Sequence, residues 1–283
     1  MRNVSTNEKG ENLTINCLIP ARLGSKRIPQ KNIKLLGNKP LIAWSIQTAL
    51  ECNLIPIVSS ESQEILDVAR QYHAEILKRP MSLSRDIVGD YPIIKHFWEY
   101  YPADITIYLR PTTPFRKKEY IFKALKAIKA DKLTTSLRSV ELMSESAFKA
   151  FIRGNRGILS AFHGSFRDAN RPDQSNRQTY KGNGYVDIIK GCQAFTGDLW
   201  GKRCFGFKTP AVIELDTKED WIKAEQYLCY QQAEKDGLST EVIDSSIIST
   251  QPSIHNQRYQ TLYNNEQEEG SGGSEQNGPE DRG

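Results

Sequence analysis

The segment at residues 19–32, IPARLGSKRIPQKN, combines cationic side chains with small residues and prolines. Its cations are Arg22, Lys26, Arg27 and Lys31. An apolar run typical of a buried strand precedes the segment, and a helical pattern that opens with Pro40 follows it. Backbone N–H groups in such a loop can hold phosphate oxygens while the cations neutralise their charge. The spacing therefore favours a polyphosphate-binding loop over a solvated basic loop.

Polar side chains also follow a second apolar run, in the segment YLRPTTPFR at 108–116. Two prolines end the run and leave several polar residues beyond it: Arg110, Thr112, Thr113 and Arg116. Polar groups on a rigid turn at the carboxyl end of a strand can position a substrate. An ordinary proline-capped loop is the alternative.

Two carboxylates lie two positions apart in the segment IELDTKEDW at 213–221. In an extended backbone Glu214 and Asp216 point to the same side, where they can bind Mg²⁺ together with substrate phosphates. Asp216 or Thr217 can instead cap the helix that follows. Because capping uses partly different groups, both interpretations can hold.

A glycine turn follows a basic residue in the segment RQTYKGNGYVD at 177–187. The glycines on either side of Asn183 let the backbone approach a ligand closely. Arg177 can pair with a substrate carboxylate through two guanidinium nitrogens. A plain turn between two strands is the alternative. The four histidines of the chain form no ligand or base pattern, so none is given a role.

The elements that carry these segments alternate between strands and helices. Apolar runs predict strands at 13–19, 54–59, 74–78, 104–109, 133–138, 184–190 and 205–215. Periodic patterns predict helices at 41–51, 63–72, 93–100, 118–129 and 218–235. This alternation predicts an α/β fold of three layers with a twisted, mostly parallel sheet. Such sheets bind ligands beyond the carboxyl ends of their strands, where the 20–32 loop is expected.

One main domain is expected at 13–248. Residues 1–12 are polar and are predicted to form a flexible leader. Residues 249–283 hold six acidic and two basic side chains, and no aliphatic or aromatic residue occurs from 264 onward, which predicts a disordered acidic tail. The alternation lapses at about 141–181, which predicts an excursion that covers the site or meets a second subunit.

Composition places the chain among globular proteins with a sizeable core. Of its 283 residues, 38% are hydrophobic and 25% are charged. No stretch of about eighteen apolar residues predicts a membrane span, and the polar start lacks the pattern of a secretory signal. Five scattered cysteines predict reduced thiols and a cytoplasmic protein. The net charge of +4 suits an anionic substrate; nucleic acid is the alternative partner, although no motif of a nucleic-acid-binding fold is present.

Together these segments resemble the cytidylyltransferases of the acylneuraminate type, which make CMP-activated acidic sugars. The resemblance runs from about residue 14 to residue 228 and is strongest at 19–32, which is similar to the family's PARxGSKxIPxKN motif. Further matches are KPLI at 39–42, VSSE at 58–61, RP at 79–80, LSRD at 83–86, PTTPFR at 111–116, RQ at 177–178, NG at 183–184 and ELDT at 214–217.

The resemblance implies a Rossmann-like nucleotidyltransferase fold, with the 141–181 excursion as a homodimer contact. It implies that CMP passes from CTP to an acidic 2-keto sugar, a sialic acid or a related nonulosonic acid, with release of pyrophosphate. Small molecules are then the substrates, and neither nucleic acid nor a membrane is a partner. Mg²⁺ is the implied cofactor, with Glu214 and Asp216 as its ligands.

The resemblance also implies roles for individual residues. The implied catalytic residues are Arg22, Lys31 and Asp216. The implied nucleotide-binding residues are Ala21, Arg22, Gly24, Ser25, Lys26, Lys31, Asn32 and Arg79. The implied sugar-binding residues are Arg110, Thr112, Arg177, Gln178, Asn183 and Asp187.

Four residues of this chain differ from the family pattern. Leu23 stands where the family usually has Gly, and Glu214 stands where it has Asp. On the sugar side Arg110 replaces a Gln, and Asp187 stands near a usual Tyr. These last two changes exchange neutral groups for a cation and an anion. They can pair with each other, or Arg110 can meet a different substrate anion, so the sugar stays open.

Two other functions therefore stay open beside nucleic-acid binding. One is a cytidylyltransferase for a different acceptor, such as another ulosonic acid or a phosphorylated small molecule. The other is a nucleotide-binding regulator without turnover, which the changes at Glu214, Arg110 and Asp187 would permit.

Overall fold

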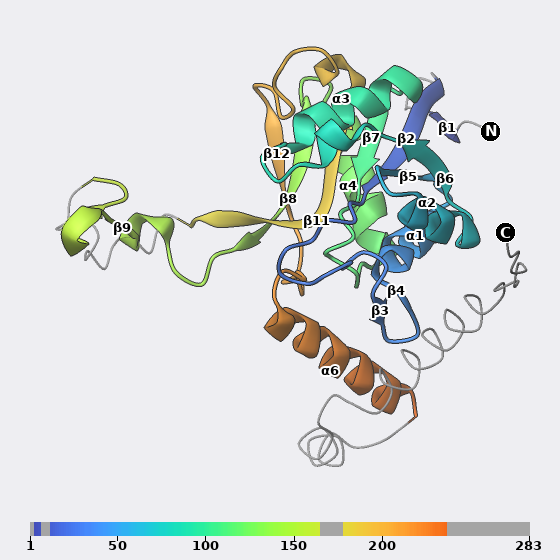
Figure 1. Ribbon diagram of the computed structural model, residues 1–283. Helices are drawn as coiled ribbons and strands as arrows, with labels where there is room; N and C mark the ends of the chain where they lie inside the picture. Colours follow the sequence, from blue (N-terminus) through green and yellow to red (C-terminus); the bar gives the residue numbers. More distant parts are fainter. Residues whose placement is uncertain (1–2, 7–11, 165–177, 237–283) are drawn as a thin grey trace, which may run out of the picture. The chain divides into compact units, whose positions relative to one another are not determined.

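The computed structural model describes residues 3–6, 12–164 and 178–236 (Figure 1). By its internal contacts the chain divides into a unit at Met1–Glu225 and a second unit at Gln226–Gly283. The first unit contains the sheet and the site. The described part of the second unit is the C-terminal portion of helix α6 (Lys218–Lys235) and the residue that follows it.

An eight-stranded sheet forms the centre of the first unit. Its main order is β12-β8-β11-β7-β2-β5-β6, and β1 pairs with β2. The strands are β1 (Asn3–Thr6), β2 (Asn12–Pro20), β5 (Pro56–Ser60), β6 (Glu75–Lys78), β7 (Ile105–Tyr108), β8 (Ser136–Leu142), β11 (Tyr180–Lys190) and β12 (Cys204–Lys208). Strands β7, β2, β5 and β6 are parallel, as are β12 and β8. The expected mostly parallel sheet is thus confirmed, with β11 antiparallel to both of its neighbours.

Helices cover both faces of this sheet and complete three layers (Figure 1). They are α1 (Leu41–Glu51), α2 (Gln63–Gln71), α3 (Asp90–Tyr100) and α4 (Lys118–Ala130). Helices α1, α2 and α4 share a core cluster with Cys17 and Ile19 of β2. Helix α3 packs Phe97 on the other face, in a cluster with Leu18. Because β2 is covered on both faces, it needs apolar side chains at successive positions, which explains the buried run Cys17, Leu18 and Ile19.

The predicted helices are all present. Helices α1 and α6 have the predicted bounds, and the other three differ by one to three residues at one end. The strand predicted at 205–215 is too long, since β12 ends at Lys208, just before Pro210, which has no N–H for a strand ladder. Asn3–Thr6, in the predicted leader, forms β1. The tail predicted at 249–283 lies outside the described residues.

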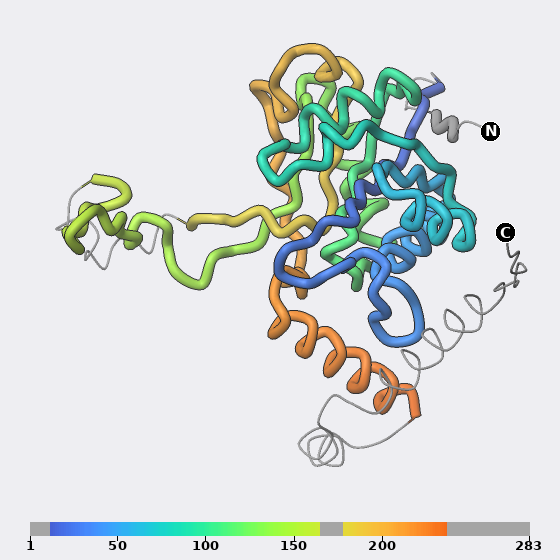
Figure 2. Tube along the Cα trace, viewed as in Figure 1, coloured from blue at the N-terminus to red at the C-terminus, as the bar shows by residue number. Residues whose placement is uncertain are grey.

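Strands β8 and β11 continue to pair beyond the end of β7 and lead into the predicted excursion (Figure 2). There, β9 (Phe151–Arg153) and β10 (Leu159–Ala161) form an antiparallel pair. The excursion exposes several large apolar side chains: Phe151, Ile152, Ile158, Leu159 and Phe162. Residues 165–177, also part of the predicted excursion, lie outside the described residues.

All five cysteines lie within the described residues and are free thiols, as predicted. Cys17 and Cys52 are buried, and burial raises the pKa of the Cys52 thiol to about 11. Among the described helices, none is long and apolar enough to cross a membrane.

Ile107 provides a test of the central position of β7. Its side chain is fully buried, and β7 lies between β2 and β11. Ile107→Ala should lower the free energy of unfolding by about 2–5 kcal/mol, because the packed sheet cannot close the cavity that is left. Urea denaturation followed by circular dichroism measures the change. The matched control is Ile87→Ala, since Ile87 is 90% exposed and should cost at most about 0.5 kcal/mol. Equal losses in both variants would contradict the buried position of Ile107.

Candidate functional site

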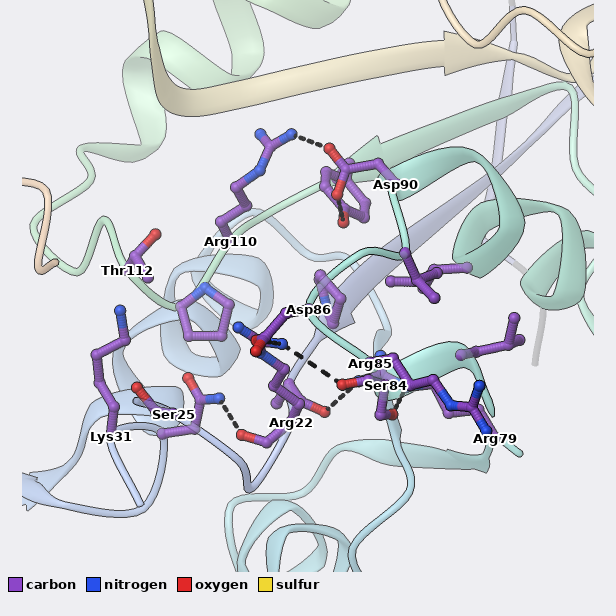
Figure 3. Close-up of a pocket in the computed structure, with 18 of the residues that line it drawn as sticks. Arg22, Ser25, Lys31, Arg79, Ser84, Arg85, Asp86, Asp90, Arg110 and Thr112 are labelled. Carbon is purple, nitrogen blue, oxygen red and sulfur yellow. Dashed lines mark hydrogen bonds and ion pairs between the residues drawn. The ribbon is translucent and has the colours of Figure 1, made fainter. Parts of the chain in front are cut away.

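A cavity of about 350 Å³ lies at the carboxyl edge of the parallel strands (Figure 3). Its walls come from the loop after β2, from residues 79–93, from the residues after β7 and from the segment that contains Glu214 and Asp216. Because β2, β5, β6 and β7 are parallel, their carboxyl ends meet at this edge. The cavity therefore lies where the sequence predicts ligand binding.

The predicted polyphosphate loop forms one wall of the cavity. The predicted nucleotide-binding residues that line it are Ala21, Arg22, Ser25, Lys31, Asn32 and Arg79. Gly24 and Lys26 belong to the same loop but are not among the lining residues. The loop thus places most of the predicted nucleotide-binding residues around one space.

Contacts from side chains hold the backbone of this loop. The Leu23 N–H donates to Glu61 Oε1 at 2.8 Å, and Asn32 Nδ2 donates to the Arg22 carbonyl at 2.8 Å. Arg79 Nη2 donates to the Ala21 carbonyl at 3.0 Å. Since the loop has no regular hydrogen-bond ladder of its own, these contacts determine where its backbone lies.

Arg79 and Glu61 form a buried ion pair behind the loop. Their side chains are 2% and 5% exposed, and Arg79 Nη2 lies 3.1 Å from Glu61 Oε2. Arg79 also donates to the Ser59 carbonyl and to Ser84 Oγ, and Ser84 Oγ donates to Glu61 Oε2 at 2.6 Å. Burial alone would raise the pKa of Glu61, but the hydrogen bonds from Ser84 and from the Leu23 N–H, with the charge of Arg79, lower that pKa below its ordinary value. Because protein groups occupy its guanidinium, Arg79 has the contacts of a positioning residue.

Asp86 lies against the cations of the loop. Its carboxylate is 2.6 Å from Arg22 Nη1 and 2.5 Å from Lys26 Nζ, and the hydrogen bonds from Lys26 and Arg22 lower the pKa of Asp86. Lys26 is 82% exposed, so the contact is a surface pair. A phosphate group that bound these cations would compete with Asp86 for them.

The predicted metal ligands Glu214 and Asp216 both line the cavity. Lys31 joins their segment to the cationic loop, because its Nζ donates to the Leu215 carbonyl at 2.6 Å and to Asp216 Oδ1 at 3.3 Å. The Leu215 N–H donates to the Thr112 carbonyl at 2.8 Å, which fixes the segment against the residues after β7. The structure therefore brings together three segments that are far apart in the sequence.

The two carboxylates fit a divalent cation by their chemistry. Partial desolvation in the cavity, followed by the charge of Asp216, raises the pKa of Glu214. A cation with hard oxygen ligands, such as Mg²⁺, would relieve this repulsion. The described residues contain no group of three potential metal-ligating side chains, so water or substrate oxygens would complete the coordination.

The helix cap that was the alternative for this segment is also present. Thr217 N–H donates to Asp220 Oδ2 at 2.9 Å, and the Asp220 N–H donates to Thr217 Oγ1 at 3.2 Å. This reciprocal arrangement caps the start of α6. Because Thr217 and Asp220 supply the capping side chains, the Asp216 carboxylate remains in the cavity.

On the predicted sugar side, Arg110 and Thr112 line the cavity. Arg110 Nη1 pairs with Asp187 Oδ2, and its Nη2 lies 2.7 Å from Asp90 Oδ2. The hydroxyl of Tyr108 donates to Asp90 Oδ1 at 2.8 Å. Burial would lower the pKa of Arg110, but the charges of Asp187, Tyr108 and Asp90 together with the hydrogen bond to Asp187 hold that pKa above its ordinary value. Of the two alternatives for Arg110 and Asp187, the structure shows that they pair with each other.

Arg116 lies behind the wall of the cavity that contains Arg110 and Thr112. It is 7% exposed and donates to the carbonyls of Arg110, Gly184 and Tyr185 and to Ser45 Oγ. Burial lowers the pKa of Arg116 to about 9. These contacts join β11, α1 and the residues after β7, so Arg116 fixes the cavity wall without lining it.

Two predicted sugar-binding residues in the described part of the chain, Gln178 and Asn183, do not line the cavity. Gln178 is exposed and accepts a hydrogen bond from the Tyr180 hydroxyl. Asn183 is buried, and its amide donates to Thr209 Oγ1 at 2.7 Å. Arg177 lies outside the described residues.

The structure adds three acidic residues that were not predicted as site residues: Glu61, Asp86 and Asp90. The LSRD match at 83–86 is a sequence signal for Asp86. Asp90 begins α3, but the helix was predicted to start at residue 93, so Asp90 fell in an unassigned loop. Glu61 follows β5 directly, and the VSSE match at 58–61 is its sequence signal, as is the place of a carboxylate after a parallel strand.

Residues 16–151 match the family model of the cytidylyltransferases. The match includes the predicted polyphosphate loop, so this segment is similar to the cytidylyltransferases. The chain is 40% identical over 125 residues to CMP-N,N'-diacetyllegionaminic acid synthase from Legionella pneumophila. That alignment covers 40% of this chain and 52% of the relative. The chain is 30% identical over 221 residues to N-acylneuraminate cytidylyltransferase A from Danio rerio, which covers 75% of this chain and 50% of the relative. The chain thus spans about half the length of these curated relatives.

Among solved structures, a CMP:2-keto-3-deoxy-manno-octonic acid synthetase complexed with CTP has a similar fold. Its TM-score is 0.59 at 16% identity, over 77% of this chain and 99% of the other. At this identity the likeness shows the fold alone. It confirms the predicted Rossmann-like nucleotidyltransferase fold.

The Arg79–Glu61 pair leads to a stability prediction. Glu61→Gln keeps the shape of the side chain but leaves the buried guanidinium without its balancing charge, so the free energy of unfolding at pH 7 should fall by about 3–5 kcal/mol. Since folding lowers the pKa of Glu61, its stabilisation is present above the ordinary value of 4.5 and is lost as the pH falls through the lower folded value. The difference between wild type and variant should therefore shrink in acid.

Urea denaturation at several pH values measures this difference. The control is Asp67→Asn, which removes one carboxylate from the exposed Asp67–Arg70 pair of α2 and should cost at most about 1 kcal/mol. A loss in Glu61→Gln no larger than in the control would show that the buried pair does not stabilise the fold.

Proposed function

We propose that this chain transfers CMP from CTP to an acidic 2-keto sugar of the nonulosonic acid class and releases pyrophosphate. The observation that carries the proposal is that the cations Arg22 and Lys31 and the carboxylates Glu214 and Asp216 line one cavity. The family match supports the nucleotide half of the reaction, since it covers the cationic loop. The names of the two relatives support the acceptor class.

In the proposed complex, Arg22 and Lys31 bind the triphosphate. Ser25 lines the same wall, and Lys26 can add its charge when phosphate takes the place of Asp86. Asn32 and Arg79 hold the loop backbone near the cytidine. Backbone and side-chain donors on a fixed loop suit a polyphosphate because they need little reorganisation when it binds.

In the proposed step, the anomeric hydroxyl oxygen of the acceptor attacks the α-phosphorus of CTP. The new O–P bond forms as the bond to pyrophosphate breaks, and the hydroxyl loses its proton. Positioning and charge neutralisation supply most of the catalysis of such a transfer. Lys31 is central to both, because it contacts the Asp216 carboxylate and lines the phosphate side of the cavity.

Glu214 and Asp216 are the residues that would hold Mg²⁺. When bound, the ion would neutralise phosphate charge and favour loss of the acceptor's proton. The helix cap formed by Thr217 and Asp220 keeps the backbone of this segment in place. Glu214 in place of an aspartate retains the carboxylate on a longer side chain.

We also propose that the excursion at 141–181 forms a homodimer contact. Exposed apolar side chains on β9, on β10 and beside them, such as Ile152 and Phe162, support this because such surfaces are usually covered by a partner. A partner subunit could then bring Arg177 and Gln178 near the acceptor, which would explain why Gln178 does not line the cavity of its own chain.

Asp216→Ala and Lys31→Ala should each lower the rate of CTP-dependent pyrophosphate release at least about hundredfold. Lys31 supplies positive charge to the phosphates, and Asp216 would hold the Mg²⁺ that neutralises them. The assay uses CTP, Mg²⁺ and a panel of 2-keto acidic sugars, with the product identified by mass. Circular dichroism should show folded variants. Asp67→Ala is the matched control and should retain full activity. A folded Asp216→Ala enzyme with a near-normal rate would refute the metal assignment.

The same assay separates the alternatives. Binding of CTP without turnover on any acceptor of the panel would favour a regulator or an acceptor of another class. Removal of divalent cations by EDTA should stop pyrophosphate release, and added Mg²⁺ should restore it. Tight, salt-sensitive binding of an oligonucleotide would instead favour nucleic acid as the partner.

Ile158→Asp should convert a dimer to a monomer, because a charge cannot be buried in an apolar contact without a partner. Ile158 is 69% exposed in the described chain, so the fold itself should tolerate the change. Sedimentation velocity measures the oligomeric state. Leu133→Asp, at a residue 67% exposed outside the excursion, is the control and should stay dimeric. A monomeric wild type would overturn the dimer proposal.

A further inference from the structure

The residues on the acceptor side form one charged cluster made of Arg110, Asp187 and Asp90. A single guanidinium bridges two carboxylates that come from different elements, Asp187 in β11 and Asp90 at the start of α3. Tyr108 supports the cluster from β7: its hydroxyl donates to Asp90, and its ring lies 4.7 Å below the Arg110 guanidinium carbon. Figure 3 shows Arg110 and Asp90 facing each other at the cavity.

The cluster places two carboxyl groups around one guanidinium, and the charge of Arg138 also acts on Asp90. Within the described residues, Asp187 Oδ1 is buried and has no hydrogen-bond partner, so Arg110 is the group that balances this carboxylate. Burial would raise the pKa of Asp90, but the charge of Arg110 and the hydrogen bond from Tyr108 lower that pKa below its ordinary value. The Asp90 carboxylate favours hydrogen-bond donors and cations as its ligands.

Exposure decides which member of the cluster a ligand can reach. The Asp187 side chain is fully buried, and that of Arg110 is 21% exposed with its guanidinium held between the two acids. The Asp90 side chain is 37% exposed and lines the cavity. A carboxylate has about four lone-pair sites, and Arg110 and Tyr108 occupy two of those of Asp90, which leaves acceptor capacity for a ligand.

We propose that Asp90 is an acceptor-binding residue that receives hydrogen bonds from a hydroxyl or a protonated amine of the sugar, and that Arg110 and Asp187 are its positioning pair. The inference rests on the proposed function and deepens it. It orients the acceptor, because a donor group of the sugar must face the exposed carboxylate of Asp90. It also gives Arg110 and Asp187 a role that the neutral residues of the family pattern at these positions cannot have.

The test begins with Asp90→Asn, which keeps the size of the side chain and removes its charge. With the best acceptor of the panel, the KM for the acceptor should rise about tenfold or more, as expected for loss of a charge-assisted hydrogen bond. The KM for CTP should change less than about twofold, which also shows that the variant is folded. Asp67→Asn is the matched control, since it removes the charge of an ion-paired aspartate far along the chain from this cluster, and it should change neither constant.

Acceptor analogues identify the group that Asp90 binds. Each deoxy analogue lacks one hydroxyl of the acceptor. For the analogue that lacks the hydroxyl facing Asp90, the kcat/KM of the wild type should fall about tenfold. The kcat/KM of Asp90→Asn should be the same for this analogue as for the full acceptor. When an amine replaces that hydroxyl, the ratio of kcat/KM between the wild type and Asp90→Asn should be larger than with the hydroxyl. The two changes are then coupled, as expected for groups in contact.

Arg110→Gln tests the positioning role. It should raise the KM for the acceptor and change the order of preference within the panel, while the KM for CTP stays near that of wild type. Asp90→Glu should restore part of the acceptor affinity that Asp90→Asn loses. An unchanged acceptor KM in Asp90→Asn, or an equal rise in the KM for CTP, would overturn the inference while the wild-type activity stands. A wild type that forms no CMP adduct on any acceptor would contradict the proposed function itself, and this inference with it.

Discussion

The buried Arg79–Glu61 pair is the interaction on which the cationic loop at 19–32 depends. A loop with the proposed phosphate-binding role must present its own N–H groups and cations outward, so it cannot also form a regular ladder. Glu61 and Arg79 instead hold the loop, because they hydrogen-bond to the backbone of Leu23 and Ala21. Because both charges are removed from water, each is stable only while the other is present. The geometry of the loop is thereby tied to β5 and β6.

Charge in the cavity is balanced locally. Arg22 and Lys26 contact Asp86, Lys31 contacts Asp216, and Arg110 contacts two carboxylates. Such pairing keeps a cavity with many ionisable groups compatible with a stable fold. It also means that an anionic ligand of Arg22, Lys31 or Arg110 would displace a carboxylate that the cation already contacts.

The position of β11 explains how two sides of one cavity can carry different chemistry. It lies antiparallel between β7 and β8, and its register places Asp187 opposite Tyr108, beside the end of β7. Arg116 then holds the carbonyls of Gly184 and Tyr185 against the residues after β7. Gly184 takes a φ of +64°, and a Cβ there would lie 3.2 Å from Thr113 Oγ1, so glycine suits this close approach. The β-strand that closes the acceptor side thus comes from a distant part of the chain.

The sequence by itself determined the elements and the nucleotide wall. Apolar periodicity is a local property, so the five helices and the buried strands could be predicted, and the cationic loop is a contiguous motif whose residues stay together after folding. The tertiary structure alone decided the acceptor side. Arg110, Asp187 and Asp90 are distant in sequence, and only the sheet register and the start of α3 bring their charges into one cluster. The tertiary structure also decided that the Arg79 guanidinium pairs with Glu61, because a buried cation needs a carboxylate that the fold places beside it.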